Sequence, residues 1–351
     1  MAIPIHVVIA DHHEAPKILV DYLTTRPQRR RHFHCWSLIG TLKAQARISS
    51  SKLKEGLRIL MKFGLLTRNP EAWCSRHLRK AMETRGVEPV CLRFGDLKAR
   101  VAMEPVVQSS GGLDLTKVPL ILVRPIGRGS LDEIIFQLDI LHRLARSGTV
   151  VINQPSAVEK AVDKYYTLTL LEEGGIAVPR TIVCEDPRQA LEAFDELGSD
   201  VVIKPIFGSR GLGITRVTDR EVASRIFRSL AFLHNVLYLQ EFIAHGTRDI
   251  RAFVIGDRVA ASMYRVAKGW KTNVSQGATA IPFSPSQEVR ELAVKAAKAL
   301  GCEIAGVDIL ESPKGLLINE INSQPGFRGL QSTTKSDIAG EIVDYLLSRL
   351  R

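Results

Sequence analysis

Three oxygen-bearing side chains near the C-terminal end of the sequence have the spacing of a metal site. Glu320 and Asn322 lie two residues apart in a strand-like segment, so they share one face of the strand. A turn at 312–315 would fold this segment back on the preceding one and set Asp308 almost opposite Glu320. Such oxygens suit Mg²⁺ or Mn²⁺. Two solvated strand acids are the alternative, which the apolar neighbours disfavour because an isolated carboxylate is not buried without a counter-charge.

A lysine followed by a glycine-rich loop indicates a phosphate-binding feature. Lys204 ends the apolar segment 201–204, and Gly208, Gly211 and Gly213 punctuate the loop before a second segment at 214–217. Glycines let the backbone approach a polyanion with its N–H groups, and a lysine supplies a point charge for phosphate. The P-loop and the dinucleotide-binding fingerprint do not fit, because each leads into a helix. A plain hairpin with a flexible tip is the alternative.

A polar pair at the end of an apolar segment could bind a nucleotide base. Gln240 and Glu241 end the segment 236–241, and the chain continues through Phe242 and Ile243 towards Asp249. The linker backbone and Gln240 could contact an adenine edge, and Asp249 could hold ribose hydroxyls. Taken alone, this pattern is weak.

Helical and strand periodicities place these residues on an α/β chain. We expect helices at 15–24, 36–47, 51–63, 75–85, 131–146, 158–172, 187–197, 219–229, 286–300 and 336–350. We expect strands at 87–92, 120–123, 150–152, 180–183, 236–241, 249–255, 258–264, 304–310 and 316–321, with two more around the glycine loop in 201–217. The alternation within 73–150 predicts a parallel sheet. Gly256-Asp257 predicts a hairpin.

Positive charge is concentrated in one N-terminal segment. Residues 26–68 hold eleven Lys/Arg and one acid, Glu55, which accounts for +10 of the chain's net +11. Such a block often contacts phosphates or acidic partners, although a solvated helical face is an equal alternative. An apolar stripe of Leu53, Leu57, Leu60 and Phe63 before Gly64 resembles part of a winged helix-turn-helix. A structural accessory role is the alternative that we favour there.

Composition excludes several classes of protein. The five cysteines are scattered and form no Cys-x-x-Cys pair, which argues against a disulfide framework or a zinc ribbon. No apolar run approaches the ~20 residues of a membrane span. The N-terminus lacks the basic start of a secretory signal. We therefore expect a cytoplasmic protein without membrane contact.

Taken in order, the motifs resemble the ATP-grasp superfamily and, within it, the RimK family of glutamate ligases. The resemblance covers residues 73–351 and is dense after 160. The motifs that carry it are 163–167, 178–181, 208–213, 240–243, 249–251, 265–268, 271–273, 306–310, 319–322, 325–326 and 337–340.

The resemblance implies a role for each matched residue. Lys164 and Lys204 would contact ATP phosphates, together with the loop residues Gly208, Ser209, Gly211 and Gly213. Gln240, Glu241, Phe242 and Ile243 would hold adenine, and Asp249 the ribose. Asp308, Glu320 and Asn322 would ligate two Mg²⁺ or Mn²⁺ ions. The phosphate and acyl-phosphate region would be lined by Arg265, Lys268, Lys271 and Asn273.

The implied reaction is an ATP-dependent, ADP-forming carboxylate–amine ligation through an acyl phosphate. The implied fold is ATP-grasp. We expect a basic N-terminal segment at 1–70, an α/β domain at 71–155, a central lobe at 156–243 and a C-terminal lobe at 244–351. L-glutamate and a carboxylate-bearing acceptor would be the substrates, and we expect a homo-oligomer.

Two departures from the RimK pattern concern substrate choice. Residues 274–278 are poorer in basic and imidazole groups than the family pattern, and Ser323-Gln324 replaces a small pair before Pro325-Gly326. Our first interpretation is addition of L-glutamate to a small molecule such as a pterin or deazaflavin coenzyme, since relatives of this kind modify both. The alternatives are a ligase that modifies a protein C-terminus and a non-enzymatic nucleotide- or nucleic-acid-binding regulator. The intact metal triad and lysines argue against the last.

Overall fold

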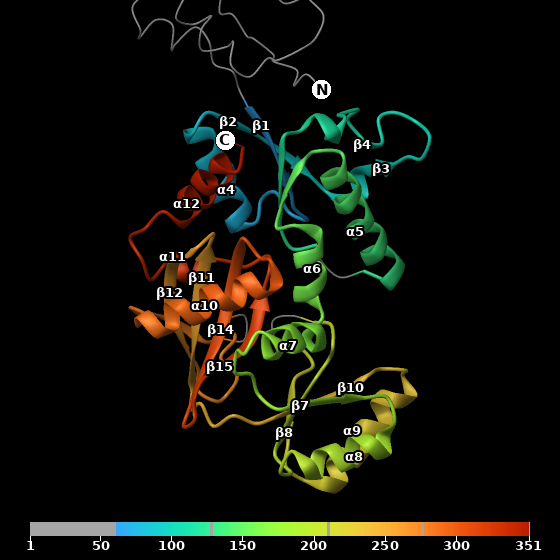
Figure 1. The fold of residues 1–351 in the computed structure, drawn as a ribbon, viewed down its shortest axis with the longest axis vertical. Coiled ribbons are helices and arrows are strands. Elements are labelled where there is room, and N and C mark those ends of the chain that lie inside the picture. Colours follow the sequence, from blue (N-terminus) through green and yellow to red (C-terminus); the bar gives the residue numbers. More distant parts are fainter. Residues whose placement is uncertain (1–60, 127–128, 209–210, 275–276, 351) are drawn as a thin grey trace, which may run out of the picture. The chain divides into compact units, whose positions relative to one another are not determined.

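The computed structural model describes residues 61–126, 129–208, 211–274 and 277–350. Helices and strands alternate in the chain, and the strands form three main sheets (Figure 1). The α/β fold class expected from the sequence is confirmed. The helices expected at 15–24 and 36–47 lie outside the described residues.

The first sheet has the strand order β2-β1-β5-β6. Its strands are β1 (Met61–Leu66), β2 (Val87–Leu92), β5 (Leu120–Val123) and β6 (Val150–Ile152). β5 pairs in parallel with both β1 and β6, as the α/β alternation predicted. Helices α4 (Trp73–Thr84) and α5 (Leu131–Arg146) belong to the same part of the chain. The short elements there are η1 (Phe94–Asp96), η2 (Leu115–Lys117) and the antiparallel pair β3 (Leu97–Ala99) and β4 (Val107–Ser109).

The expectation of a helix through residue 63 is wrong for the part of it that the structure describes. Residues 61–66 form β1, whose last four side chains are buried, while 51–60 lie outside the described residues. Gly64 does not end a helix. It packs against β5, where an added Cβ would lie 2.8 Å from Cγ1 of Ile121. The sheet thus begins before the domain boundary expected at residue 70, and the division into four segments stays a prediction.

Two helices replace the one expected at 158–172. They are α6 (Pro155–Val162) and α7 (Lys164–Glu173). Asp163 separates them, and its carboxylate accepts a hydrogen bond of 3.0 Å from the Tyr166 N–H, which caps α7. The cap places Lys164 in the first turn of α7.

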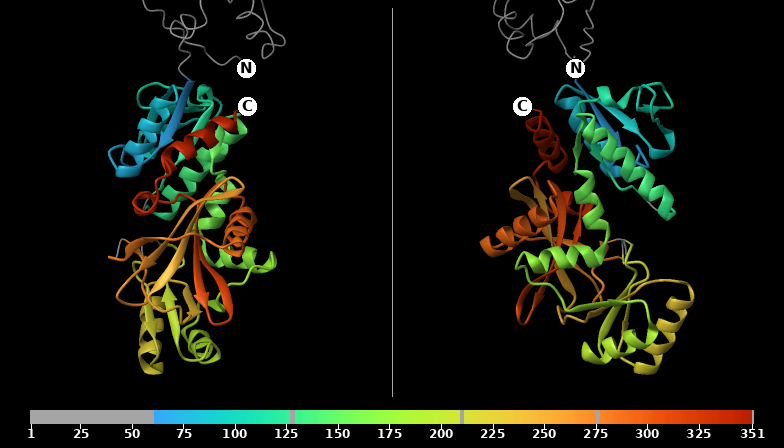
Figure 2. Two further views of the ribbon diagram at one scale, coloured as in Figure 1. Left: turned by 90° about the vertical axis from the view of Figure 1, so that its left-hand side faces the viewer. Right: turned by 45° about the vertical axis from the view of Figure 1, so that its right-hand side comes forward.

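The second sheet is antiparallel, with the order β7-β10-β8-β9. It contains β7 (Thr181–Cys184), β8 (Val201–Lys204), β9 (Thr215–Val217) and β10 (Leu237–Glu241). Helices α8 (Pro187–Glu196) and α9 (Arg220–Phe232) contact each other and this sheet (Figure 2). Together with the sheet they enclose an apolar core. Lys204 therefore stands at the end of a strand anchored in a core.

The third sheet has the order β13-β12-β11-β14-β15 and is antiparallel throughout. Its strands are β11 (Arg248–Ile255), β12 (Arg258–Val266), β13 (Thr279–Pro282), β14 (Ile304–Ser312) and β15 (Gly315–Asn322). Helix α10 (Gln287–Leu300) packs against this sheet, and α11 (Arg328–Gln331) and α12 (Ile338–Ser348) follow β15. The hairpin predicted at Gly256-Asp257 joins β11 to β12.

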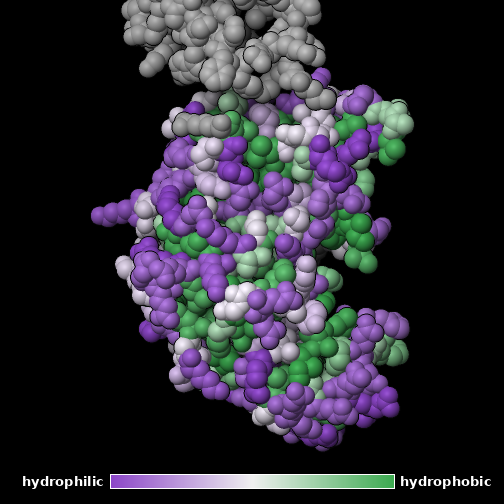
Figure 3. Space-filling view, in the orientation of Figure 1, coloured by the Kyte–Doolittle hydropathy of each residue, from purple (hydrophilic) through white to green (hydrophobic). Residues whose placement is uncertain are grey.

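The surface mixes residue types. On the face seen in Figure 3, hydrophilic residues lie among smaller hydrophobic groups. Within the part of the chain that the structure describes, no helix has the length and apolar character needed to cross a bilayer.

Candidate active site

Charged side chains form a row across the third sheet. In the strand register, Asp249 lies opposite Arg265, Arg251 opposite Asp308, and Asp308 opposite Glu320. Asp249 and Arg251 are two residues apart and so share one face of β11. The expected hairpin that brings Asp308 opposite Glu320 is therefore present.

Ion pairs link this row. Arg265 Nε donates to Asp249 Oδ1 at 2.7 Å, and its Nη2 lies 2.9 Å from Asp308 Oδ2. Arg251 Nη2 donates to Asp308 Oδ2 at 3.0 Å. Burial raises the pKa of the Asp308 carboxyl to about 6, although Arg251 and Arg265 act to lower it. Asp308 is thus a buried acid whose counter-charges are supplied by neighbouring strands.

A bulge in β15 brings one more polar side chain to this face. Ile309 pairs with Ile318 but Asp308 pairs with Glu320, so Asn319 is an extra residue on β15. In a regular strand Asn319 and Glu320 would point to opposite faces. With the bulge, both line the same pocket. Re-aiming a side chain is a frequent role of bulges near active sites.

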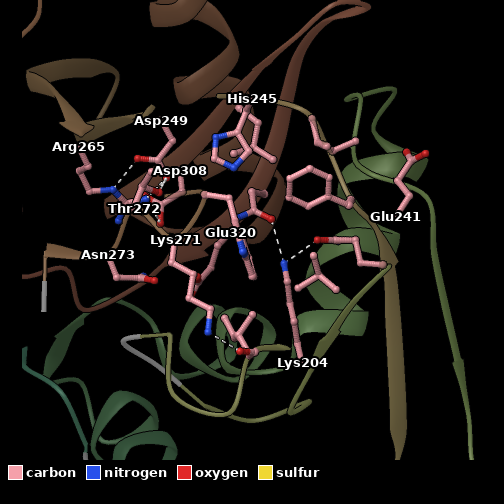
Figure 4. Close-up of a pocket in the computed structure, with 18 of the residues that line it drawn as sticks. Lys204, Glu241, His245, Asp249, Arg265, Lys271, Thr272, Asn273, Asp308 and Glu320 are labelled. Atoms are coloured by element: carbon pink, nitrogen blue, oxygen red, sulfur yellow. Dashed lines mark hydrogen bonds and ion pairs between the residues drawn. The ribbon is translucent and has the colours of Figure 1, made fainter. Parts of the chain in front are cut away.

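The pocket beside this row contains most of the predicted residues (Figure 4). The predicted residues that line it are Lys164, Lys204, Gln240, Glu241, Phe242, Ile243, Asp249, Arg265, Lys271, Asn273, Asp308 and Glu320. Gly208, Gly211, Gly213, Lys268 and Asn322 are described but are not part of its lining, and Lys268 is exposed. Ser209 lies outside the described residues.

Three lysines in the pocket donate hydrogen bonds to uncharged oxygens. Lys204 Nζ donates to Gln240 Oε1 at 2.5 Å and to Asn319 Oδ1 at 3.0 Å. Lys164 Nζ donates to the Gly208 carbonyl at 3.0 Å, and Lys271 Nζ to the Ile214 carbonyl at 2.7 Å. Burial lowers the pKa of Lys204 to about 8 and also lowers the pKa of Lys164. Glu320 acts electrostatically on Lys164 and Lys204, but none of the three lysines forms an ion pair with a described residue, so a polyphosphate could pair with them.

The glycine loop touches the chain beyond β12. Gly211 has a φ of +71°, which favours glycine, and an added Cβ would lie 2.4 Å from Asn273 Oδ1. Lys164 and Lys271 both bond to carbonyls of the segment 206–214. The loop is therefore held by side chains from α7 and from the segment after β12.

The linker after β10 carries an aromatic cluster. The Arg216 guanidinium lies 3.5 Å from the centroid of the Phe242 ring, and Trp270 meets that ring edge-on with centroids 5.9 Å apart. Asp200 fixes Arg216 through hydrogen bonds of 2.7 and 2.6 Å. Phe242 and Trp270 both line the pocket, so its lining combines aromatic rings with charged side chains.

Some pocket residues were not predicted. They are Val202, Ile214, His245, Trp270, Thr272, Leu310 and Asn319. Thr272 Oγ1 donates to Asp249 Oδ2 at 2.7 Å, and so helps to orient that carboxylate. Thr272 and Trp270 flank the predicted residue Lys271. Their position next to it in the sequence is the signal that could have identified them as pocket residues. The part played by Asn319 depends on a bulge that has no sequence signature.

Oxygen donors in the pocket fit a divalent cation. Asp308 and Glu320 supply carboxylates to the pocket, and Asn322, which lies opposite Gly306 on β14 and outside the pocket lining, carries an amide oxygen. Within the described ranges no group of three or more His, Cys, Asp or Glu residues is positioned for a metal. This all-oxygen set suits Mg²⁺ or Mn²⁺ better than zinc.

Comparisons with known proteins agree with this geometry. A family model described as the RimK-like ATP-grasp domain matches residues 161–346. The chain is 32% identical over 321 residues to the tetrahydromethanopterin:alpha-L-glutamate ligase of Methanosarcina acetivorans, covering 82% of this chain and 99% of that protein. It is 33% identical over 291 residues to a probable alpha-L-glutamate ligase of Photobacterium profundum, covering 82% and 95% respectively.

A solved structure shows the same fold. The ATP-grasp ligase PsnB, complexed with a phosphomimetic variant of its minimal precursor, Mg and ADP, superposes with a TM-score of 0.64 at 21% identity. The superposition covers 83% of this chain and 99% of that one.

Proposed function

Since this chain belongs to the RimK-like ATP-grasp family, we propose that it adds L-glutamate to a pterin-type cofactor through an acyl phosphate. The chain is an ATP-grasp ligase, and the fold implies ATP and divalent metal ions. The name of the Methanosarcina relative supports the pterin assignment, and the match covers nearly the whole length of that relative. The observation that supports the proposal most directly is the pocket itself, where three lysines that form no ion pair with a described residue lie with Asp308 and Glu320.

We assign the polyphosphate to the three lysines. Lys164, Lys204 and Lys271 would exchange their uncharged oxygen partners for phosphate oxygens, and charge-assisted hydrogen bonds are the stronger ones. The glycine loop 208–213 would add backbone N–H groups. Phosphoryl transfer depends mainly on such positioning and charge stabilisation, and no side-chain nucleophile is required.

The geometry refines the nucleotide contacts. The Gln240 side chain already forms hydrogen bonds with three side chains. Its Oε1 accepts from Lys204, and its Nε2 donates to the hydroxyls of Thr181 and Tyr238. We therefore propose that adenine is held by the linker backbone and the Phe242 ring. The N–H groups of Glu241 and Phe242 bond to Arg180 and Asp200, whereas that of Ile243 has no hydrogen-bond partner within the described residues. The Ile243 N–H would bind the base edge.

Asp249 and Arg265 act as a pair in this proposal. Asp249 is 2% exposed and holds Arg265 and Thr272, so its role is to orient Arg265 rather than to reach a ribose by itself. Arg265 would stabilise charge on the acyl phosphate, as would Lys271 and Asn273 from the segment after β12. Lys268 stays a proposed member of that group although it does not line the pocket.

We assign two Mg²⁺ or Mn²⁺ ions to Asp308, Glu320 and Asn322. When bound, the ions neutralise charge on the transferring phosphoryl group. Arg251 and Arg265 supply the positive charge that lets Asp308 stay buried beside this position. Homo-oligomer formation, and an acidic or nucleic-acid partner for residues 1–70, remain proposals.

An acceptor screen tests the proposed function. ADP release is measured with ATP, Mg²⁺ and L-glutamate against tetrahydromethanopterin, a deazaflavin coenzyme and a peptide acceptor. Release that depends on the pterin, with a product heavier by glutamyl residues, is expected. Release that depends on the peptide alone would transfer the assignment to protein modification, and release with no acceptor dependence would overturn it.

A further inference from the structure

Two loops outside the pocket meet just beyond the strand that carries Glu320 and Asn322. One loop follows β5 and the other follows β15. Arg124 Nη2 donates to the Pro325 carbonyl at 2.9 Å, and the Ile126 N–H donates to Gln324 Oε1 at 3.1 Å. The loops are thus joined by two hydrogen bonds that run in the same direction, from the β5 loop to the β15 loop.

Arg124 is a buried cation without an anionic partner in the described part of the chain. Only 5% of the residue is exposed. It donates to the Pro325 carbonyl, its guanidinium carbon lies 5.9 Å from the centroid of the Phe327 ring, and the Cys74 thiol acts on it electrostatically. Burial lowers the pKa of this guanidinium. Arg265 is buried to a similar degree but pairs with two aspartates, so Arg124 is the exception to the rule that buried charges are paired.

Gln324, on the β15 loop of the same loop contact, adds a second unused donor. Its Nε2 is buried and has no hydrogen-bond partner among the described residues. The amide cannot be reversed without losing the hydrogen bond from the Ile126 N–H, because only its oxygen can accept that hydrogen. The loop contact therefore offers N–H donors from Arg124 and Gln324 and lacks a matching acceptor.

The missing group should be a carboxylate close to the reaction centre. A planar guanidinium matches the two oxygens of a carboxylate, and an amide N–H can donate to one of these oxygens. Pro325 is three residues beyond Asn322, so this contact lies within ~11 Å of Asn322 along the chain. The neighbouring Pro125 and Gly326 are exposed, so the loop contact reaches the surface. Gln324 also belongs to the Ser-Gln pair that departs from the RimK pattern.

We propose that Arg124 and Gln324 form a subsite that binds one of the two carboxylates of the L-glutamate being added. This inference rests on the proposed ligase function and deepens it. It assigns recognition of that carboxylate to the contact between the β5 and β15 loops. ATP binding is left to the pocket described above.

The test compares steady-state kinetics of the full-length wild type and variants. Arg124→Met should raise the KM for L-glutamate at least tenfold, with kcat and the KM for ATP nearly unchanged. Thermal stability should be equal or higher, because an unpaired buried charge is replaced by an apolar side chain. Arg124→Lys keeps the charge but not the paired N–H donors of the planar guanidinium, so its KM for L-glutamate should be intermediate. Arg188→Met removes an arginine whose side chain is 88% exposed and is the control, with no change expected.

Two amides identify which carboxylate is bound. L-glutamine lacks the side-chain carboxylate and L-isoglutamine lacks the α-carboxylate. One of the two amides lacks the carboxylate that Arg124 binds. The wild type and Arg124→Met should use that amide equally poorly, because neither can make the contact with it. Equal sensitivity of both amides to the substitution would overturn the subsite.

The outcomes separate this inference from the proposed function. An unchanged KM for glutamate in folded Arg124→Met overturns the subsite and leaves the ligase assignment intact. If the wild type uses another carboxylic amino acid instead, and its KM rises in the variant, glutamate is wrong and the subsite stands. If ADP release depends on none of these amino acids, both are overturned. Should Arg124→Met fail to fold, Gln324→Leu replaces it. The KM for L-glutamate should then rise in Gln324→Leu, and an unchanged KM would overturn the subsite.

Discussion

Glu320 has a protein environment different from that of Asp308, although the two lie side by side. Asp308 is held by two arginines, whereas the described ion pairs include none for Glu320. A carboxylate that lines the pocket and has no arginine is the freer ligand for a cation. Asp308 can bind a cation only in competition with its arginines or beside them. We therefore expect metal binding to depend most directly on Glu320.

Glu320→Gln should lower ADP release about 100-fold or more, since loss of even an outer partner of a metal ligand often costs 10–100-fold. Mn²⁺ binding, followed by electron paramagnetic resonance, should weaken in parallel. Glu311→Gln is the control, because Glu311 is on the same hairpin but pairs with Arg248 and Tyr264. Full ADP release and normal Mn²⁺ binding in folded Glu320→Gln would contradict the metal assignment.

Lys204 should make nucleotide affinity depend on pH. Burial lowers its pKa to about 8 in the free protein, and phosphate favours its charged form. Affinity for ATP should therefore be full below pH 8 and fall as the pH rises through about 8, by up to about tenfold per unit.

Lys204→Arg keeps its charge throughout this range and is the matched control. Calorimetric titration with a non-hydrolysable ATP analogue between pH 7.5 and 9.5 would measure the difference, since the arginine variant should give the flatter profile. Identical profiles for the two proteins would show that Lys204 does not bind phosphate.

At the scale of elements, the glycine loop combines a turn with a close contact. Gly211→Ala should weaken nucleotide binding for two reasons. The left-handed backbone costs on the order of 1–2 kcal/mol for a residue with a Cβ, and that Cβ would displace Asn273. Gly246 has the same φ of +71° with nothing within 4 Å of an added Cβ, so Gly246→Ala measures the strain alone. If both variants bind the nucleotide analogue equally in fluorescence titration, the contact with Asn273 has no role in the site.

Local signals explain which elements could be predicted. Helix α5 has the expected bounds because Ser130 and Glu133 form a capping box and Gly148 follows its end. The β14–β15 hairpin was found from its turn and apolar runs. Residues 61–63 were misassigned because Phe63 extends a helical stripe, and the partner that makes this segment a strand, β5, lies more than fifty residues away.

The candidate site was predictable where ordered motifs carry it. Twelve of the predicted residues line one pocket. The β-bulge at Asn319 and the engagement of Gln240 by Lys204 depend on contacts between distant segments, and no spacing in the sequence encodes them. The same limit applies to Arg124, whose lack of an anionic partner is a property of the folded chain.

At the scale of the whole molecule, the basic segment 26–68 divides at residue 60. Its last part forms β1, which lies between β2 and β5 in the first sheet. Removing residues 1–68 would therefore delete an internal strand with buried side chains at 63–66 and unfold that sheet. A truncation that leaves the catalytic part intact must stop at residue 60.

Residues 1–60 should be separable from catalysis, because every residue assigned to ATP or metal lies after 160. Charge reversal at Arg29, Arg30, Arg31, Lys52 and Lys54 should leave affinity for the ATP analogue and pterin-dependent ADP release unchanged. What should fall is binding to a polyanion, here a single-stranded RNA probe. The logarithm of the wild-type affinity for that probe should fall with the logarithm of the salt concentration, with a slope of about −0.7 per neutralised phosphate. The slope for the variant should be smaller in magnitude.

The control is charge reversal at Lys314 and Arg188, which are exposed and lie outside the basic segment. RNA affinity equal in the wild type and in both variants would leave the segment without a nucleic-acid role. If the charge-reversed protein loses ATP binding while it remains folded, the segment belongs to the catalytic site, and the division of the chain at residue 60 is wrong.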